Sequence, residues 1–280
     1  MPQRARAFAQ VDVFGAEPYQ GNPVAVVLDG SDLTDDAMAH FARWTNLSET
    51  TFVLPPTTPE ADYRLRIFTP GGEIPFAGHP TLGSAHAWLT AGGSPRRRDV
   101  LVQECAMGLV QLRGGAGDLS FQAPQPVRTG PLDEDLLARI ARGLRIDADA
   151  VVAHQWVDNG PGWAAVQLAT AAEVLALEPD DAHMTDLMIG AVGAHPAGAS
   201  EQFELRAFCG PIGVREDPVT GSLNASVAQW LIGTGAAPTA YRAAQGSRVG
   251  RRGLISVRQE DGETWVGGAC TTCVTGEVRL

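Results

Sequence analysis

Hydrophobic and polar positions follow two spacings along this chain, one typical of strands and one typical of helices. The clearest change between them lies in residues 66–93, RIFTPGGEIPFAGHPTLGSAHAWLTAGG. An alternating, strand-like start gives way to a loop rich in glycine and proline, and then to apolar residues at helical spacing. This pattern predicts a strand, a loop and a helix, with Pro80 at the first helical position.

The start of that helix predicts an anion site. Backbone N–H groups of a first helical turn have no acceptor within the helix, so we expect those of Gly78, His79 and Thr81 to point outward. Such a terminus suits a carboxylate or a phosphate. His79 also places a titratable side chain where acid/base chemistry on a small acid would need it.

A second copy of this arrangement follows half a chain later. At an offset of 140 residues, Leu65, Arg66 and Phe68 match Leu205, Arg206 and Phe208. At an offset of 142 residues, the matches are Ser84, Trp88, Leu89 and Gly93 with Ser226, Trp230, Leu231 and Gly235. Coincidence is the alternative, but paired Trp-Leu positions after similar strands favour a repeat. We therefore predict an α/β (α+β) fold of two pseudo-symmetric domains, each a sheet with one central apolar helix, with their helix N-termini brought together.

The remaining pattern sets the domain limits and the other elements. We place the domains at 1–122 and 127–280, joined by the linker 123–126, and leave open whether the last strand returns to the first domain. Helices are predicted at 34–46, 132–144 and 171–188. Strands are predicted at 5–14, 21–28, 48–54, 241–257 and 263–278, with two or three short strands in 99–121 and two strands in 151–168.

Composition narrows the classes of partner and chemistry. The net charge of −11 argues against nucleic acid or an anionic membrane surface. No apolar run is long enough to span a bilayer and the N-terminus lacks a signal core, so a cytoplasmic location is expected. Exposed sheet edges in such domains favour a homodimer. All 21 basic residues are arginine, and without lysine a pyridoxal-phosphate Schiff base or a Walker-type phosphate loop is excluded.

The four cysteines do not suggest a disulfide framework or a metal centre. They are too few and too scattered for the former. Cys270 and Cys273 form one CxxC without a second pair or a nearby histidine, so we assign neither a metal nor a redox role. No metal site is predicted.

Polar residues near the two predicted helix starts complete the candidate site. Asp217 precedes the second helix as His79 precedes the first, and Ser222 follows it; a plain helix cap is the alternative for Asp217. Glu49 begins a strand, where a solvated edge carboxylate is the alternative. Asn22 before Pro23 is a turn residue or, because it would lie near the cleft between the domains, a site residue.

Four motifs, GNPVAVV, SETTFV, FTPGGEIPFAGHPTLGSAHAWL and REDPVTGS, resemble in order and spacing those of the phenazine-biosynthesis PhzF-like family. The resemblance implies the diaminopimelate epimerase fold, with mostly antiparallel sheets rolled around the central helices. It implies Glu49 as the catalytic acid/base, with His79 and Asp217 as polar catalytic partners. It further implies that Ser222 and the amides of Gly78 and Gly221 bind the substrate.

The family's activity suggests a cofactor-independent isomerase of a small unsaturated or hydroxylated carboxylic acid, such as trans-2,3-dihydro-3-hydroxyanthranilate. One carboxyl group, with its pKa raised by burial, can take a proton from one carbon and return it to another on the same face. Inversion of a stereocentre needs two groups, and neither predicted helix start carries the cysteine that epimerases of this fold use. The alternatives are a non-catalytic small-acid binding protein, or an epimerase or lyase acting on another substrate.

Overall fold

The computed structural model describes residues 4–280, which form two compact units. Unit 1 consists of the described residues up to Gln122 together with Gly267–Leu280, and unit 2 of Ala123–Val266. The final strand β16 (Glu263–Arg279) therefore begins in unit 2 and continues in unit 1. Four short 3₁₀ turns lie in unit 2, at Ala148–Ala150, Asp181–His183, Gly210–Ile212 and Ser247–Val249.

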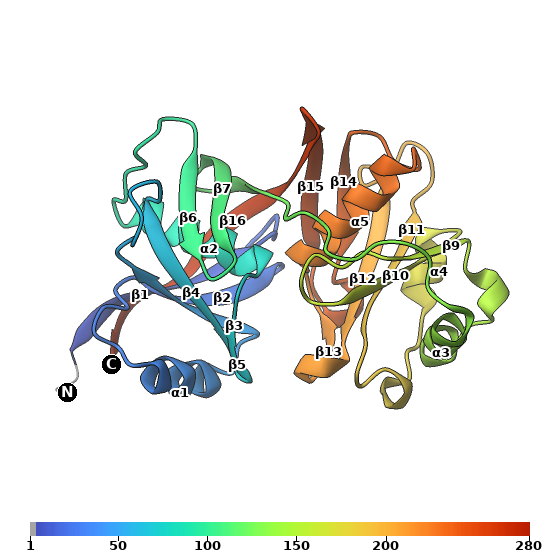
Figure 1. Ribbon diagram of the computed structural model, residues 1–280, viewed down its shortest axis with the longest axis horizontal. Coiled ribbons are helices and arrows are strands. Elements are labelled where there is room, and N and C mark those ends of the chain that lie inside the picture. The colour runs from blue at the N-terminus through green and yellow to red at the C-terminus, as the bar shows by residue number, and fades with distance from the viewer. Residues whose placement is uncertain (1–3) are drawn as a thin grey trace. The chain divides into compact units, whose positions relative to one another are not determined.

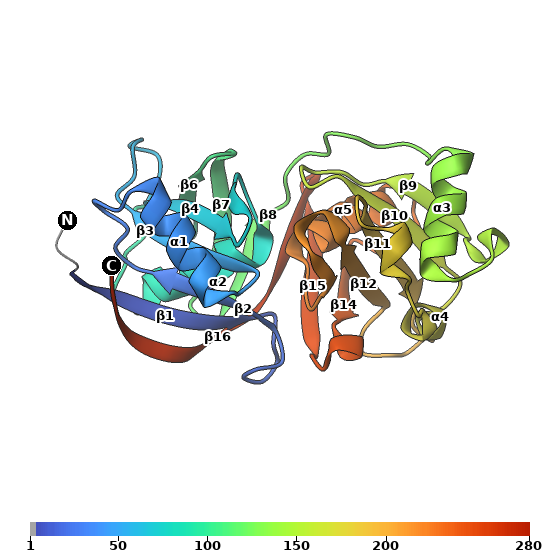
Figure 2. The ribbon, with the colours of Figure 1, turned by 90° about the horizontal axis from the view of Figure 1, so that it is seen from below.

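Unit 1 is a sheet that closes on itself around a helix (Figures 1 and 2). Its strands are β1 (Ala5–Val13), β2 (Asn22–Val27), β3 (Glu49–Leu54), β4 (Tyr63–Thr69), β5 (Gly72–Ile74), β6 (Leu101–Cys105), β7 (Gly108–Gly115) and β8 (Asp118–Gln122). The hydrogen-bonded order is β1-β2-β3-β4-β6-β7-β8-β16, and β1 also pairs with β16. This extra pairing leaves no open edge along the circuit.

The enclosed helix is α2 (Gly78–Thr90), which carries no acidic residue in its first turn and no basic residue in its last. Ten of its thirteen residues are buried, as expected for a helix without a polar face. Gly83 lets the helix approach the sheet, because a Cβ there would lie 2.4 Å from Cγ1 of Val24 and 3.0 Å from Cγ2 of Val13. The close fit fixes how deep α2 sits in unit 1.

A second helix, α1 (Asp35–Thr45), covers the outer face of the same sheet. Thr34 caps it by accepting from the backbone N–H of Ala37, and Asn46 ends it in the left-handed conformation. Its apolar face, with Met38 and Phe41, packs in one cluster with Phe52 of β3 and Phe68 of β4. Because side chains alternate across a strand, the neighbours of Phe52 face the opposite side, toward α2.

Unit 2 repeats this plan around α5 (Gly221–Gly233). Its strands are β9 (Ala153–Trp156), β10 (Trp163–Leu168), β11 (Met188–Ala194), β12 (Phe203–Cys209), β13 (Val214–Asp217), β14 (Ala240–Gln245) and β15 (Gly253–Glu260). Their order is β16-β15-β14-β12-β11-β10-β9, with β13 beside β12. Gly190 of β11 faces Leu223 of α5, whereas Ile189 and Ala191 belong to the core beneath α3 (Glu134–Leu144) and α4 (Ala171–Ala176).

The two strand orders confirm the predicted repeat. β2 and β3 are parallel neighbours connected through α1, as β10 and β11 are connected through α4. β4 and β6 are parallel neighbours connected through α2, as β12 and β14 are connected through α5. The sequence matches at an offset of 140 residues fall in β4 and β12, which occupy the same place in the two orders.

Three predictions of local structure were wrong. The helix predicted for 171–188 ends at Ala176, and Met188 begins β11, because the apolar run MIGAVGA is a fully buried strand without alternation. Pro80 is the third residue of α2, which begins at Gly78. The backbone N–H of Thr81 does not point outward, since it donates to the carbonyl of Ala77 at 3.2 Å.

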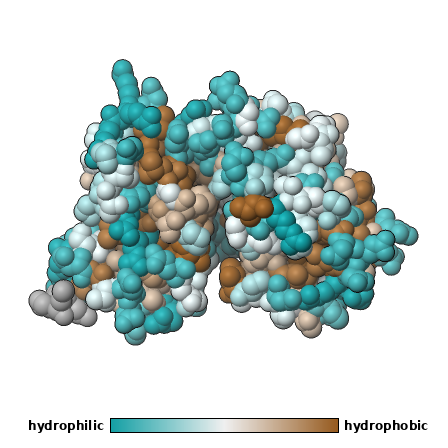
Figure 3. All heavy atoms as spheres, viewed as in Figure 1, coloured by the Kyte–Doolittle hydropathy of each residue, from teal (hydrophilic) through white to brown (hydrophobic). Residues whose placement is uncertain are grey.

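Hydrophilic and hydrophobic residues are interspersed on the face of each unit that Figure 3 shows. None of the helices among residues 4–280 is long and apolar enough to cross a membrane.

We expect Gly83→Ala to lower the free energy of unfolding by about 1–3 kcal/mol, because the added methyl group would overpack the contact with Val24. Gly233→Ala is the matched control, since Gly233 lies in α5 and an added Cβ there meets nothing within 4 Å. The control should be neutral or stabilising by up to about 1 kcal/mol. Urea denaturation measures both, and equal effects of the two substitutions would contradict the proposed packing.

Candidate active site

Three predicted residues meet in unit 1 at the start of the central helix. Asn22 is the first residue of β2, Glu49 is the first of β3, and His79 is the second of α2. Adjacent parallel strands begin at the same edge of a sheet, which brings Asn22 and Glu49 together. All three are buried, with exposed fractions of 1%, 8% and 4%.

The direction of Glu49 follows from strand alternation. Two residues further along β3, Thr51 contacts α2, and its Oγ1 lies 2.8 Å from Oγ of Ser84. Glu49 and Thr51 share a face of the strand, so the Glu49 carboxyl also faces α2. The Thr51–Ser84 hydrogen bond thus ties the strand that carries Glu49 to the helix that carries His79.

The imidazole of His79 lies between Asn22 and Glu49. Its Nε2 is 3.2 Å from Oε2 of Glu49, close but without the alignment of a direct hydrogen bond. Its Nδ1 is 3.3 Å from Nδ2 of Asn22, and the ring also hydrogen-bonds the backbone of Pro23. Ser48 donates to Oδ1 of Asn22 at 3.4 Å. Asn22 is therefore a buried strand residue beside His79 rather than a turn residue.

Burial lowers the pKa of His79 to about 3, although the hydrogen bond to Pro23 acts in the opposite direction. The imidazole is therefore neutral near pH 7. A neutral ring offers one donor and one acceptor, so His79 can hydrogen-bond a neighbour or a ligand without adding a positive charge.

In unit 2, the predicted residues gather at the start of α5. Asp217 ends β13, Gly221 is the first residue of α5, and Ser222 follows it. Asp217 is not the helix cap that the sequence allowed, because Thr220 occupies that position. Instead, Oδ2 of Asp217 accepts a hydrogen bond of 2.6 Å from Oγ1 of Thr220.

Ser222 is held by residues that the sequence did not single out. Nε1 of Trp163 donates to its Oγ at 3.0 Å, and Nδ2 of Asn159 donates to its backbone carbonyl at 3.0 Å. These contacts leave the hydroxyl hydrogen of Ser222 able to donate elsewhere. Gly78 and Gly221 each open a central helix, so their backbone N–H groups belong to the first-turn donors that suit an anion.

Two buried glutamines were also missed. Gln103 of β6 donates to Oγ1 of Thr81 in α2 at 3.0 Å, and Gln245 of β14 contacts the first turn of α5. A lone glutamine in a mostly apolar strand has no sequence signature that separates it from a surface residue. Burial alone identifies these two, with exposed fractions of 0% and 1%.

The cysteines lie outside the first turns of α2 and α5. Cys105, Cys209 and Cys270 are buried and Cys273 is half-buried, and none of these four is joined in a disulfide. Burial raises the pKa of the Cys270 thiol well above its usual range. Among residues 4–280, no group of three His, Cys, Asp or Glu side chains is placed to hold a metal ion.

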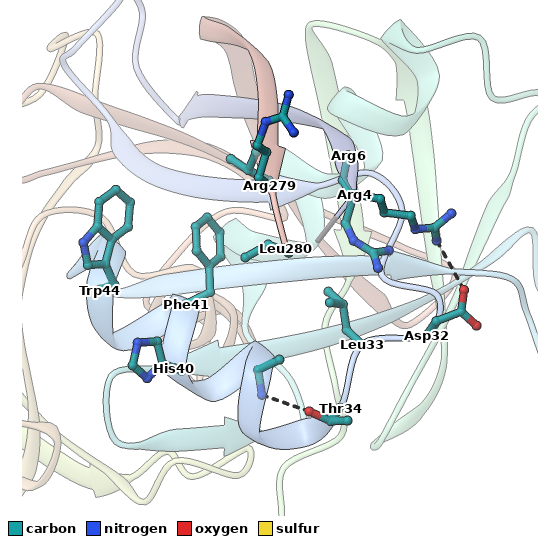
Figure 4. Close-up of a pocket in the computed structure, with 12 residues that line it drawn as sticks. Arg4, Arg6, Asp32, Leu33, Thr34, His40, Phe41, Trp44, Arg279 and Leu280 are labelled. Carbon is teal, nitrogen blue, oxygen red and sulfur yellow. Dashed lines mark hydrogen bonds and ion pairs between the residues drawn. The ribbon is translucent and has the colours of Figure 1, made fainter. Parts of the chain in front are cut away.

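A cavity of about 780 Å³ lies elsewhere in unit 1, between α1, the start of β1 and the end of β16 (Figure 4). Trp44, Phe41 and Leu280 form its apolar wall, and Arg4 and Arg6 line it from β1 and the residue before it. Neither Glu49 nor His79 lines this cavity.

The two units define a class of protein in which similar half-chains each roll a mostly antiparallel sheet around one helix, the diaminopimelate epimerase-like fold. A solved phenazine biosynthesis protein of the PhzF family from Enterococcus faecalis has this fold. It matches with a TM-score of 0.82 at 23% identity, over 99% of this chain and 100% of that chain.

Sequence comparison gives the family. The sequence model described as phenazine biosynthesis-like protein (PhzC-PhzF) matches residues 11–276. "Antisense-enhancing sequence 1" of Schizosaccharomyces pombe is 35% identical over 97% of this chain and 98% of its own length. "Trans-2,3-dihydro-3-hydroxyanthranilate isomerase" of Pseudomonas aeruginosa is 39% identical over 77% of this chain and 76% of its own length.

The chain belongs to the phenazine biosynthesis-like family, as its four motifs predicted. It is an isomerase of that family.

The lowered pKa of His79 predicts a specific pH dependence of stability. Between about pH 6.5 and pH 3 the unfolded imidazole binds a proton that the folded one does not, so stability falls as the pH falls through this window. The contribution of His79 reaches about 1.4 kcal/mol per pH unit. We expect His79→Gln to flatten the measured dependence by up to that slope.

Urea denaturation at pH steps across this window, with wild type and variant compared at each step, makes the measurement. His40→Gln, which removes an exposed imidazole, is the control and should leave the slope unchanged. Parallel curves for wild type and His79→Gln would show that His79 is not kept neutral by burial.

Proposed function

We propose that this isomerase moves a proton within a small unsaturated or hydroxylated carboxylic acid, without a cofactor, and that Glu49 is its acid/base. The observation that carries the proposal is the buried carboxyl of Glu49, 3.2 Å from the neutral imidazole of His79 at the start of α2. A buried carboxyl beside first-turn amides suits proton transfer on a substrate that itself carries a carboxylate.

A neutral His79 supports the role of Glu49 as a base. An imidazolium at the same distance would stabilise the carboxylate and weaken it as a proton acceptor. A neutral imidazole can instead orient the carboxyl group or hydrogen-bond the substrate. We therefore assign His79 to the substrate's polar partners rather than to the transfer of the proton.

The internal repeat favours one acid/base group over two. In the parallel pairs, Glu49 begins β3 opposite Val24, and Met188 begins β11 opposite Trp163 at the equivalent position of unit 2. Met188 is buried, and its thioether side chain cannot exchange a proton. One group suits a shift in which a C–H bond breaks at one carbon, the double bond moves, and a C–H bond forms at another carbon on the same face.

The thiols give no support to a two-cysteine epimerase. Cys209 ends β12, twelve residues before α5 begins, and the other three cysteines lie in β6 and β16. None of them stands in the first turn of α2 or α5. We therefore prefer isomerisation to inversion of a stereocentre.

For the substrate we propose trans-2,3-dihydro-3-hydroxyanthranilate or a close analogue, because a relative with 39% identity is named for that compound. We propose that Gly78, Gly221 and Ser222 bind it through N–H and O–H donors, its carboxylate included. Asp217 would accept from a donor group of the same substrate.

The test is turnover of this compound in deuterated water by wild type and by Glu49→Gln. We expect wild type to form product with solvent deuterium at the newly protonated carbon. The variant keeps the shape of the side chain but loses the proton carrier, so its kcat should fall by about 10³-fold, within the range for general acid/base groups.

Glu60→Gln, which changes an exposed carboxyl of the same unit, should retain wild-type kcat. A Glu49→Gln variant that stays active would remove Glu49 from the chemistry. Tight binding of the compound by wild type, with neither product nor isotope exchange, would instead identify a small-acid binding protein.

A further inference from the structure

Gln245 uses its whole side-chain amide to hold the first turn of α5. Its Oε1 accepts from the backbone N–H of Thr220 at 3.1 Å and from Nδ2 of Asn224 at 2.9 Å. Its Nε2 donates to the backbone carbonyl of Asp217 at 3.0 Å and to Oγ1 of Thr220 at 2.8 Å. Both acceptor positions and both hydrogens of the amide are therefore in use.

The backbone dictates the direction of these hydrogen bonds. The N–H of Thr220 can only donate and the carbonyl of Asp217 can only accept, so the Gln245 amide fits in one orientation. Nε2 must then donate to the Thr220 hydroxyl, which leaves the hydrogen of that hydroxyl to go to another acceptor. That acceptor is Oδ2 of Asp217, at 2.6 Å.

We propose that Gln245 is a positioning residue for Asp217, acting through the Thr220 hydroxyl. By fixing the direction of the hydroxyl, it keeps a hydrogen-bond donor on Oδ2, which stabilises the carboxylate form of Asp217 and fixes its orientation. This inference rests on the proposed role of Asp217 as a polar partner of the substrate. It adds a residue from β14, outside the motifs that identified the site.

Unit 1 contains a similar glutamine that serves as a comparison. Gln103 is as deeply buried as Gln245 and also holds the fourth residue of a central helix, Thr81 in α2. Its other partners are the hydroxyl of Tyr63 and the thiol of Cys105. These partners include no carboxyl group, so Gln103 can support the helix without acting on a carboxylic acid.

The substitution Gln245→Glu replaces the Nε2 donor by an acceptor at nearly unchanged size. The Thr220 hydroxyl should then turn toward the introduced carboxylate, and Asp217 should lose its donor while gaining a like charge nearby. Thr220→Val removes the hydroxyl without adding a charge, and Thr220→Ser retains it. Gln103→Glu is the matched control, because it buries a carboxylate at the corresponding helix of unit 1.

The first measurement is a carboxyl ¹³C NMR titration of the full chain, with the Asp217 signal assigned from Asp217→Asn. We expect Gln245→Glu and Thr220→Val to raise the titration midpoint of Asp217 by about one pH unit or more. Thr220→Ser and Gln103→Glu should leave the midpoint within about 0.3 pH units of wild type. Unfolding measured alongside separates this shift from a loss of stability.

The second measurement is the pH profile of kcat/KM with trans-2,3-dihydro-3-hydroxyanthranilate. The acidic limb reports the groups that must be deprotonated, Glu49 and Asp217 among them, and its Asp217 component should move upward in Gln245→Glu and Thr220→Val by the same amount as the NMR midpoint. On the alkaline side of the shifted limb, kcat/KM should recover to within about threefold of wild type. A glutamine that only supports the fold would lower kcat/KM equally at every pH.

The outcomes distinguish this inference from the proposed function. An unmoved Asp217 midpoint in both Gln245→Glu and Thr220→Val would overturn the positioning role, even if the enzyme turns over the compound. Shifted Asp217 midpoints in the two variants, together with a wild-type protein that does not turn over the compound, would support the hydrogen-bond relay and reject the proposed substrate. An equal shift in Gln103→Glu would also overturn the inference, since Gln103 holds α2 of unit 1 through Thr81 and Asp217 belongs to unit 2.

Discussion

The enclosure of an apolar helix by a rolled sheet is the constraint on which the candidate site depends. A helix that is buried along its length still begins with N–H groups that lack partners within the helix. Those groups need polar partners, either atoms at the strand ends or a bound anion, because an unpaired buried donor costs free energy. In unit 1 the strand ends supply Asn22 and Glu49, which lie beside His79 of α2. The polar centre is thus a consequence of how the helix is enclosed.

Burial then decides the electrostatics of that centre. Two charged side chains in a buried position would both lose their hydration, and their mutual attraction would have to offset that desolvation free energy. The structure avoids that cost, because the pKa of His79 is lowered and the ring is neutral near pH 7. Only Glu49 can then carry charge in this pair. A single carboxyl beside a neutral hydrogen-bonding ring can act in turn as a general base and a general acid.

The sequence was sufficient where it contained a pattern and insufficient where the contact was made only by folding. The repeat was visible because equivalent strands and helices kept similar residues, and the helix starts were visible from glycine, proline and spacing. Gln245 was missed because it contacts Asp217 and Asn224 across more than twenty residues, and nothing beside it marks it as buried. β11 was missed because a strand covered on both faces shows no alternation, and because the acidic stretch before it resembled the rest of a helix.

The repeat also shows how one scaffold can come to hold different chemistry in its two copies. Each unit encloses a helix and uses a buried glutamine near its fourth residue, so these features follow from the fold. The acid/base candidate does not follow from the fold, because Glu49 in one copy corresponds to Met188 in the other. The two glutamines also differ in what they reach. Only the hydrogen bonds of Gln245 extend to a carboxylate, through the hydroxyl of Thr220 to Asp217. Each copy therefore holds one buried carboxyl group near the start of its central helix, Glu49 beside a neutral imidazole and Asp217 beside a hydroxyl donor. These two settings favour different tasks, because the neutral imidazole adds no positive charge beside Glu49, whereas the hydroxyl donor stabilises the charged form of Asp217.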